Sequence, residues 1–117
     1  MTNKNYNSGR AFEYRVKKFL ESKGYYVLRS AGSHSPIDLL AVHKRNHDCL
    51  LIQCKHGSAK ADQEELEALY RLQWYFFNSY AYLVTTDGRK LAFYHVTKDP
   101  ENGSYMVDKE GVRPCPI

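Results

Sequence analysis

The sequence lacks the features of a membrane protein, of a secreted protein and of a protein with a structural zinc site. Its three cysteines have neither zinc-ribbon nor redox-pair spacing, and its five histidines do not predict a zinc site. The N-terminal residues are polar, unlike a secretory signal peptide, and no apolar run is as long as a membrane span. We therefore expect a soluble, cytoplasmic protein without a membrane partner.

The bulk composition is that of one small globular domain with a basic bias. With 117 residues, 43% of them hydrophobic, the chain is long enough for one core and too short for two. The formal net charge of +4 permits a nucleic-acid partner without establishing one. We expect a single domain over residues 1–117, irregular at residues 1–7 and from about residue 98 onward.

The pattern of apolar and turn residues predicts two helices and at least five strands. The first helix is expected to begin near Gly9, with Asn7 or Ser8 as its cap, and to end at Gly24. The second is expected to begin after Asp62, with Glu65 completing a capping box, and to end near Asn78. Strands are expected at residues 25–29, 37–42, 49–55, 80–85 and 91–96, with a short one possible at 105–107 and a hairpin turn at 87–88. This order predicts an α/β fold with a mixed central sheet flanked by helices.

The most informative stretch runs from Ser35 to Lys55. Asp38 opens one apolar run, and Gln53, one spacer and Lys55 close the next. Side chains alternate along a strand, so Gln53 and Lys55 point the same way. If the two runs pair as antiparallel neighbours, Asp38 lies beside both. Two oxygen ligands for a hard divalent cation, next to an ammonium group, suit metal-assisted hydrolysis of a phosphodiester.

Each of these residues also has a simpler interpretation. Asp38 could lie at a sheet edge or form a salt bridge with Lys55, although a buried aspartate without a partner or cation would be costly. Gln53 and Lys55 could be the polar end of a strand that leaves the core. Glu13 flanks the apolar stripe of the first helix, and it could simply be a solvated glutamate at the edge of the buried face.

The residues then resemble a known group, the PD-(D/E)xK nuclease superfamily, and within it the archaeal-type Holliday junction resolvases. The resemblance covers roughly residues 9–55. It rests on the residues from Gly9 to Glu13, on the glycine-led run GYYVLRSAGS at residues 24–33, on IDLLA at residues 37–41, and on IQCK at residues 52–55. It implies the nuclease fold of the restriction endonucleases.

The resemblance also implies roles for individual residues. The metal ligands of that family correspond to Glu13, Asp38 and Gln53, and the ion is Mg²⁺, with Mn²⁺ as an expected substitute and no small-molecule cofactor. Lys55 holds the position of the family's catalytic lysine. A loop serine also contributes, which matches Ser33 or Ser35; an ordinary turn is the other interpretation of that loop.

The resemblance further implies DNA as the partner and a homodimer as the active form. Arg29 matches a DNA contact, and we expect Arg10, His34 and Lys60 to contribute to the same surface. The aromatic residues of the second helix, Tyr70, Trp74 and Phe77, are either the dimer interface or the core of the monomer.

The chain departs from the resolvase pattern at Gln53, where that family has an acidic residue. A glutamine removes one negative charge from the metal site, yet it resembles Mrr-like restriction nucleases of the same superfamily. Our first hypothesis is a Mg²⁺-dependent endonuclease that resolves four-way DNA junctions by paired cleavage. The alternatives are a restriction- or repair-type endonuclease on duplex DNA, and a DNA-binding module with the same fold that does not cleave.

Overall fold

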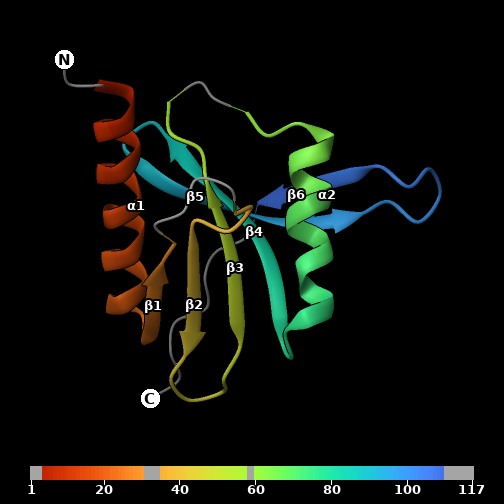
Figure 1. The fold of residues 1–117 in the computed structure, drawn as a ribbon, viewed down its shortest axis with the longest axis horizontal. Coiled ribbons are helices and arrows are strands. Elements are labelled where there is room, and N and C mark those ends of the chain that lie inside the picture. Colours follow the sequence, from red (N-terminus) through yellow and green to blue (C-terminus); the bar gives the residue numbers. More distant parts are fainter. Residues whose placement is uncertain (1–3, 31–34, 58–59, 110–117) are drawn as a thin grey trace.

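One six-stranded sheet carries two helices, and its strands follow one another in sequence order (Figure 1). A computed structural model gives this arrangement for residues 4–30, 35–57 and 60–109. β3 and β4 are parallel and every other neighbouring pair is antiparallel, so the sheet is mixed, as predicted. The elements are α1 (Lys4–Ser22), β1 (Tyr25–Arg29), β2 (Leu39–His43), β3 (Cys49–Cys54), α2 (Gln63–Arg71), a 3₁₀ turn η1 (Leu72–Tyr75), β4 (Ser79–Asp87), β5 (Lys90–Lys98) and β6 (Tyr105–Lys109).

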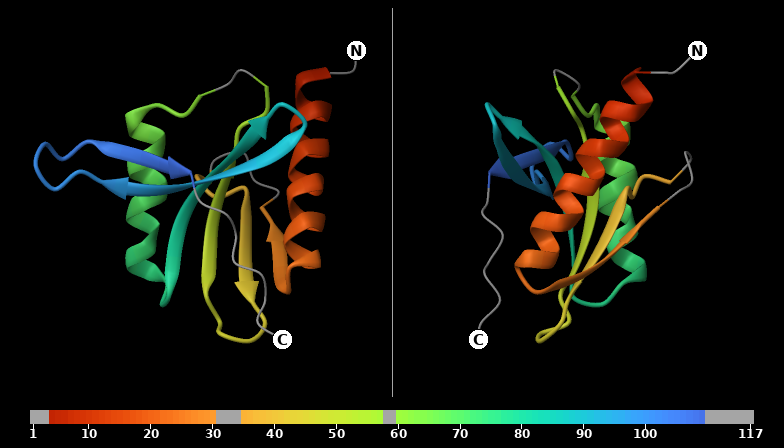
Figure 2. Two further views of the ribbon diagram at one scale, coloured as in Figure 1. Left: turned by 180° about the vertical axis from the view of Figure 1, so that it is seen from behind. Right: turned by 90° about the vertical axis from the view of Figure 1, so that its left-hand side faces the viewer.

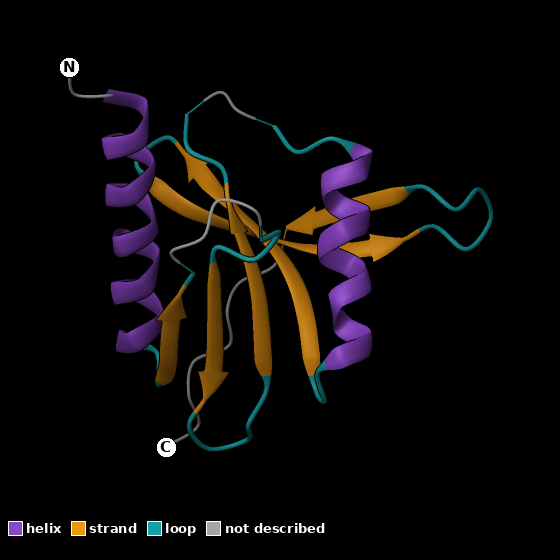
Figure 3. Cartoon of the chain, in the orientation of Figure 1, coloured by secondary structure: helices purple, strands orange, loops and turns teal. Residues whose placement is uncertain are grey.

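The two helices cover opposite faces of the sheet. In β3, Leu50 and Ile52 pack in the cluster that contains the apolar stripe of α1, whereas Leu51 packs with Leu66 and Leu69 of α2. Successive residues of a strand point to opposite faces, so this division places α1 and α2 on different sides. Figure 3 shows the strands running between the two helices. A central strand covered on both sides explains why β3 is apolar at successive positions.

The helix boundaries differ from the predicted ones in two places. α1 begins at Lys4 and continues through Gly9, where an added Cβ would meet nothing within 4 Å. Gly9 is therefore not a boundary, because a single glycine costs a helix only about 1 kcal/mol. α2 ends at Arg71, not near Asn78. There the chain tightens into η1 and reverses through Asn78, whose φ is +49°, so that β4 can begin beside β3.

The two hairpins in the second half of the sheet also refine the predictions. Asp87 pairs with Lys90, so the two-residue loop is Gly88-Arg89 and not Asp87-Gly88. Residues 98–109 are not irregular throughout, because β6 forms there and pairs with β5. The side chain of Gln63 bonds both backbone polar groups of Tyr105, which links the start of α2 to this strand. Figure 2 shows the β5–β6 hairpin extending beyond α2.

Among the described residues, no helix is both long enough and apolar enough to cross a bilayer.

Candidate active site

The candidate site lies where β1 and β3 end, β2 begins and α2 starts (Figure 1). Asp38 is the last residue before β2, which begins at Leu39, two positions later than the predicted strand over residues 37–42. Its backbone N–H nevertheless donates to the Ile52 carbonyl at 2.7 Å, and its carbonyl accepts from Ser30 at 2.8 Å. These bonds hold Asp38 between β1 and β3, as the predicted antiparallel pairing of β2 and β3 requires.

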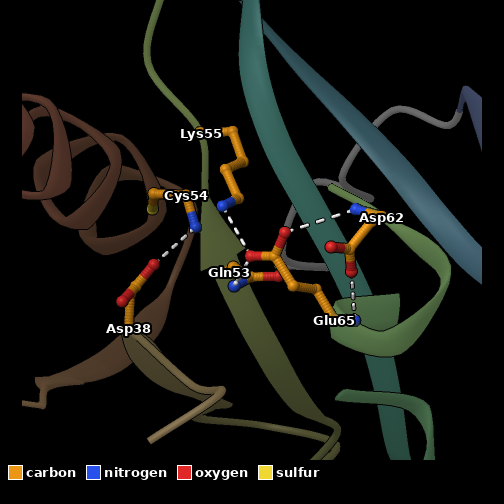
Figure 4. Close-up of polar contacts among 6 residues, drawn as sticks. All are labelled: Asp38, Gln53, Cys54, Lys55, Asp62 and Glu65. Carbon is orange, nitrogen blue, oxygen red and sulfur yellow. Dashed lines mark hydrogen bonds and ion pairs between the residues drawn. The ribbon is translucent and has the colours of Figure 1, made fainter. Parts of the chain in front are cut away.

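The carboxylate of Asp38 turns toward the end of β3. Its Oδ2 accepts a hydrogen bond from the backbone N–H of Cys54 at 2.8 Å (Figure 4). Cys54 is the spacer between Gln53 and Lys55, so the predicted proximity of these residues to Asp38 is present. The bond uses one oxygen of the carboxylate and leaves Oδ1 available for another ligand.

Lys55 follows β3 and forms an ion pair that the sequence did not predict. Its backbone N–H donates to Val84 of β4 at 2.9 Å, which continues the strand pairing by one residue. Its ammonium lies 2.6 Å from Oε2 of Glu65, in the first turn of α2. Among the described residues, the salt bridge of Lys55 is therefore to Glu65 and not to Asp38, which was one of the alternatives raised above.

Gln53 brings an unsatisfied oxygen to the same place. Its Nε2 donates to Oε2 of Glu65 at 3.2 Å, and its Oε1 is buried and has no hydrogen-bond partner among the described residues. The acceptor carboxylate of Glu65 determines which amide atom faces it, because only the nitrogen can donate. A buried carbonyl oxygen without a donor costs free energy, and a hard cation is a partner that would satisfy it.

Glu13 reaches the site from α1 but is held by an arginine. Its Oε1 lies 2.8 Å from Nε of Arg29, and both side chains are 19% exposed. The Arg29 guanidinium also lies over the ring of Tyr14, with its carbon 5.2 Å from the ring centroid. Arg29, the predicted DNA contact, is thus a partner of Glu13 at the end of β1.

Burial and neighbouring charge shift the titration of the three carboxyl groups. Burial raises the pKa of Asp38, against the opposing effect of the Cys54 hydrogen bond. Burial and then the Asp38 charge raise the pKa of Glu13. The hydrogen bond from Lys55 lowers the pKa of Glu65, and the Glu65 charge in turn acts to raise the pKa of Asp38. The positive charges of Lys55 and Arg29 act in the opposite direction and lower the pKa of Asp38, as a bound cation would, because they stabilise its ionised form.

This electrostatic pattern predicts how pH alters the effect of magnesium on stability. The raised pKa of Asp38 means that its contribution to stability is full below its ordinary pKa of 3.8 and is lost as pH rises through the folded-state pKa. A cation bound to the ionised Asp38 carboxylate offsets that loss of stability. At low pH, protons compete with the cation for the carboxylate. We expect MgCl₂ to raise the melting temperature more at pH 8 than at pH 5, measured by differential scanning fluorimetry against NaCl of equal ionic strength. An equal shift at both pH values would contradict the prediction.

The remaining predicted site residues lie at the surface or outside the described residues. Ser33 and His34 fall outside them. Ser35 is exposed, and its hydroxyl accepts from the backbone N–H of Ile37 at 3.1 Å, which fits the turn interpretation of the loop. Lys60 is exposed, and Arg10 is exposed with its guanidinium over the Tyr14 ring.

Glu65 is the site residue that the sequence reasoning missed. It had a sufficient local explanation, since the predicted capping box is present: Glu65 N–H donates to Asp62, and Asp62 N–H donates to Glu65 Oε1. The signal that could have identified it was the missing charge at Gln53, which calls for a carboxylate elsewhere. Nothing local indicated that the carboxylate would come from α2.

The side-chain oxygen atoms of the site are candidate ligands for a metal ion. Within the described part of the chain, no three His, Cys, Asp or Glu side chains form a metal-binding cluster. Asp38 and the unsatisfied Oε1 of Gln53 nevertheless offer carboxylate and carbonyl oxygens, which are the ligands that Mg²⁺ accepts while retaining several waters. The residues present therefore fit a sparsely ligated Mg²⁺ ion.

The mixed sheet, with Asp38, Gln53 and Lys55 at one edge, defines a nuclease fold of the restriction-endonuclease type. The family model Mrr_cat, described as a restriction endonuclease, matches residues 5–96. The chain therefore belongs to this restriction endonuclease family.

Two archaeal proteins are similar to the chain. The crossover junction endodeoxyribonuclease Hjc of Methanocaldococcus jannaschii is 31% identical over 108 residues, which are 89% of this chain and 78% of that protein. The structure of Hjc from Archaeoglobus fulgidus, a Holliday junction resolvase, superposes with a TM-score of 0.63 and 23% identity, over 83% of this chain and 85% of that one. These matches confirm the resemblance and the fold class predicted from the sequence.

Proposed function

We propose that this protein is a Mg²⁺-dependent endonuclease that resolves four-way DNA junctions by paired strand cleavage as a homodimer. The observation that carries the proposal is the 31% identity to a crossover junction endodeoxyribonuclease over 89% of the chain. The free thiols of Cys49 and Cys54 agree with an enzyme of the reducing cytoplasm.

Each residue of the candidate site has a defined part in this proposal. Asp38 and Gln53 would hold Mg²⁺, and Glu13 would add negative charge from α1. A bound Mg²⁺ would supply Lewis-acid stabilisation of the scissile phosphate and a more acidic water. Lys55 would place its ammonium beside the phosphate and stabilise the negative charge that develops there. The Glu13–Arg29 pair would keep both side chains oriented until DNA arrives.

The DNA surface would be formed by basic side chains around this edge of the sheet. Arg10 and Lys60 are both exposed; Arg10 lies on α1, and Lys60 precedes α2. Arg29 would add a contact at the end of β1, and Ser33, Ser35 and His34 belong to the loop that precedes Asp38. Such contacts to phosphates supply affinity without base specificity.

The dimer is supported by an exposed aromatic surface. Trp74, Tyr75 and Phe77 are 81%, 80% and 95% exposed, and they follow one another around η1. Large aromatic side chains in this number are unusual on a free surface and typical of interfaces. Tyr70 differs from them: it is partly buried, and its ring centroid lies 5.3 Å from that of Tyr105, so it packs within the monomer. We therefore assign the interface to Trp74, Tyr75 and Phe77.

A second candidate function is cleavage of linear duplex DNA. The family model that matches is that of a restriction endonuclease, and Gln53 is the residue at which the chain departs from the resolvase pattern. The third hypothesis, a module that binds without cleaving, is weakened because Asp38 and Lys55 are both retained at the same edge of the sheet.

The test is a cleavage assay that separates the three functions. A labelled four-way junction and a linear duplex of the same arm sequence are incubated with the protein in MgCl₂ or in EDTA. We expect paired cuts in the junction that require Mg²⁺ and little cutting of the duplex. Equal cutting of both substrates would favour the duplex endonuclease, and binding without any cutting would favour the non-cleaving module.

A further inference from the structure

Glu65 contacts both polar residues at the end of β3. Its Oε2 accepts from the Lys55 ammonium at 2.6 Å and from the Gln53 amide at 3.2 Å. Figure 4 shows Asp38 on one side of the strand end and Glu65 on the other. The Glu65 side chain is 33% exposed and that of Lys55 is 22% exposed, so the pair is partly shielded from water.

We propose that Glu65 replaces the acidic residue that the resolvase pattern has at position 53. Its carboxylate positions the Gln53 amide and the Lys55 ammonium, and its negative charge supports the cation that Asp38 and Gln53 bind. Glu65 is thus a positioning residue that acts through Gln53 and Lys55. This inference rests on the proposed function, because it concerns the same metal site.

Helix capping alone does not account for the contacts of Glu65. The capping contact uses Oε1, which accepts from the Asp62 N–H at 3.3 Å, whereas Oε2 makes the two contacts to β3. A glutamine at this position completes a capping box as well as a glutamate does, so the cap does not require a charge. The ion pair with Lys55 does require one.

The charges around the site explain why the carboxylate matters. Gln53 is neutral, so Asp38 and Gln53 together offer a cation a single negative charge, while the Lys55 ammonium repels it. Glu65 balances the ammonium and draws it toward α2. It also orients the Gln53 amide through the bond from Nε2, which leaves Oε1 buried and, among the described residues, without a hydrogen-bond partner. Loss of the Glu65 charge therefore weakens the site twice, through electrostatics and through orientation.

The first experiment is Glu65→Gln in the full-length protein. The variant keeps the volume and the capping hydrogen bond, so circular dichroism and the melting temperature in EDTA should remain close to wild type. We expect Mn²⁺ and Mg²⁺ to bind at least ~10-fold more weakly in calorimetric titrations without DNA, as is typical when a side chain that orients a metal ligand is replaced. The matched control is Glu67→Gln, which removes the same charge from the same helix. Glu67 pairs with Arg71 instead of Lys55, with its Oε1 2.8 Å from Arg71 Nη2. That control should bind as wild type does.

The decisive experiment moves the carboxylate from position 65 to position 53. In Gln53→Glu/Glu65→Gln, one carboxylate and one amide are exchanged at positions whose side chains already touch, so the total charge is conserved. We expect the metal affinity to recover to within about three-fold of wild type. That difference is small beside the roughly 10–100-fold loss of affinity that is typical when a side chain that orients a metal ligand is replaced. Gln53→Glu alone should bind at least as tightly as wild type, because it adds an oxygen ligand with charge.

Two results would overturn the inference. One is Glu65→Gln binding metal as wild type does, and the other is a folded double variant that binds no better than Glu65→Gln alone. Failure of the proposed function would give a different result from both of these, because the wild-type protein itself would then bind no metal in the titration and cut no junction.

Discussion

Asp38→Asn is expected to abolish junction cleavage while leaving junction binding largely intact. Asparagine keeps the shape and can still accept the hydrogen bond from the Cys54 N–H, so the strand end should stay in place. What is lost is the negative charge that would hold Mg²⁺. Removing a group that stabilises the transition state through a metal lowers rates by about 10³-fold. Phosphate contacts supply most of the DNA affinity, so binding should change little.

The experiment compares single-turnover cleavage of a four-way junction with the dissociation constant for the same junction in CaCl₂. Asp48→Asn is the matched control, since it makes the same substitution in the turn between β2 and β3, at the opposite end of these strands. The control should cut normally. If Asp38→Asn cuts at the wild-type rate, the site is not where we have assigned it.

Phe77→Glu is expected to convert the proposed dimer into monomers. A two-fold interface contains each residue twice, so one substitution places two buried charges in it, each of which is costly without a partner. Phe77 is 95% exposed in the isolated chain, so the monomer should fold as before. Light scattering at micromolar concentration should give twice 13.6 kDa for wild type and 13.6 kDa for the variant.

The same substitution should uncouple the two cuts in a junction. A monomer has one site, so we expect nicked junctions in place of the paired cuts that resolve them. Met106→Glu is the matched control, because it places the same charge on an exposed apolar side chain of β6. A wild-type protein that is monomeric with and without junction DNA would contradict the dimer and favour an endonuclease that acts through one site.

The sequence predicted the parts of the site that depend on neighbouring strands. β2 and β3 are joined by a short turn, so alternation and antiparallel pairing were sufficient to place Asp38 beside the residues around Cys54. Glu13 could be placed near the site but not its partner Arg29, because that pair depends on how α1 crosses β1. Glu65 could not be placed at all from pattern alone.

The reason lies in the parallel pairing of β3 and β4. Parallel neighbours need a crossover, and α2 with η1 is that crossover, so the face on which α2 packs is decided by tertiary structure. The early end of α2 has a similar cause, because the reversal into β4 outweighs the local signal near Asn78.

The strand order has a consequence for when nuclease activity can arise during folding. β1 to β3 form one antiparallel meander and β4 to β6 another, and each can assemble from contacts close in sequence. Among the described strands, the two meanders pair with each other along β3 and β4, where the Lys55 N–H donates to Val84 and α2 brings Glu65 to the end of β3. A partly synthesised chain that has formed only the first meander would lack this joint, so a growing polypeptide would acquire its cutting site only when the second meander docks.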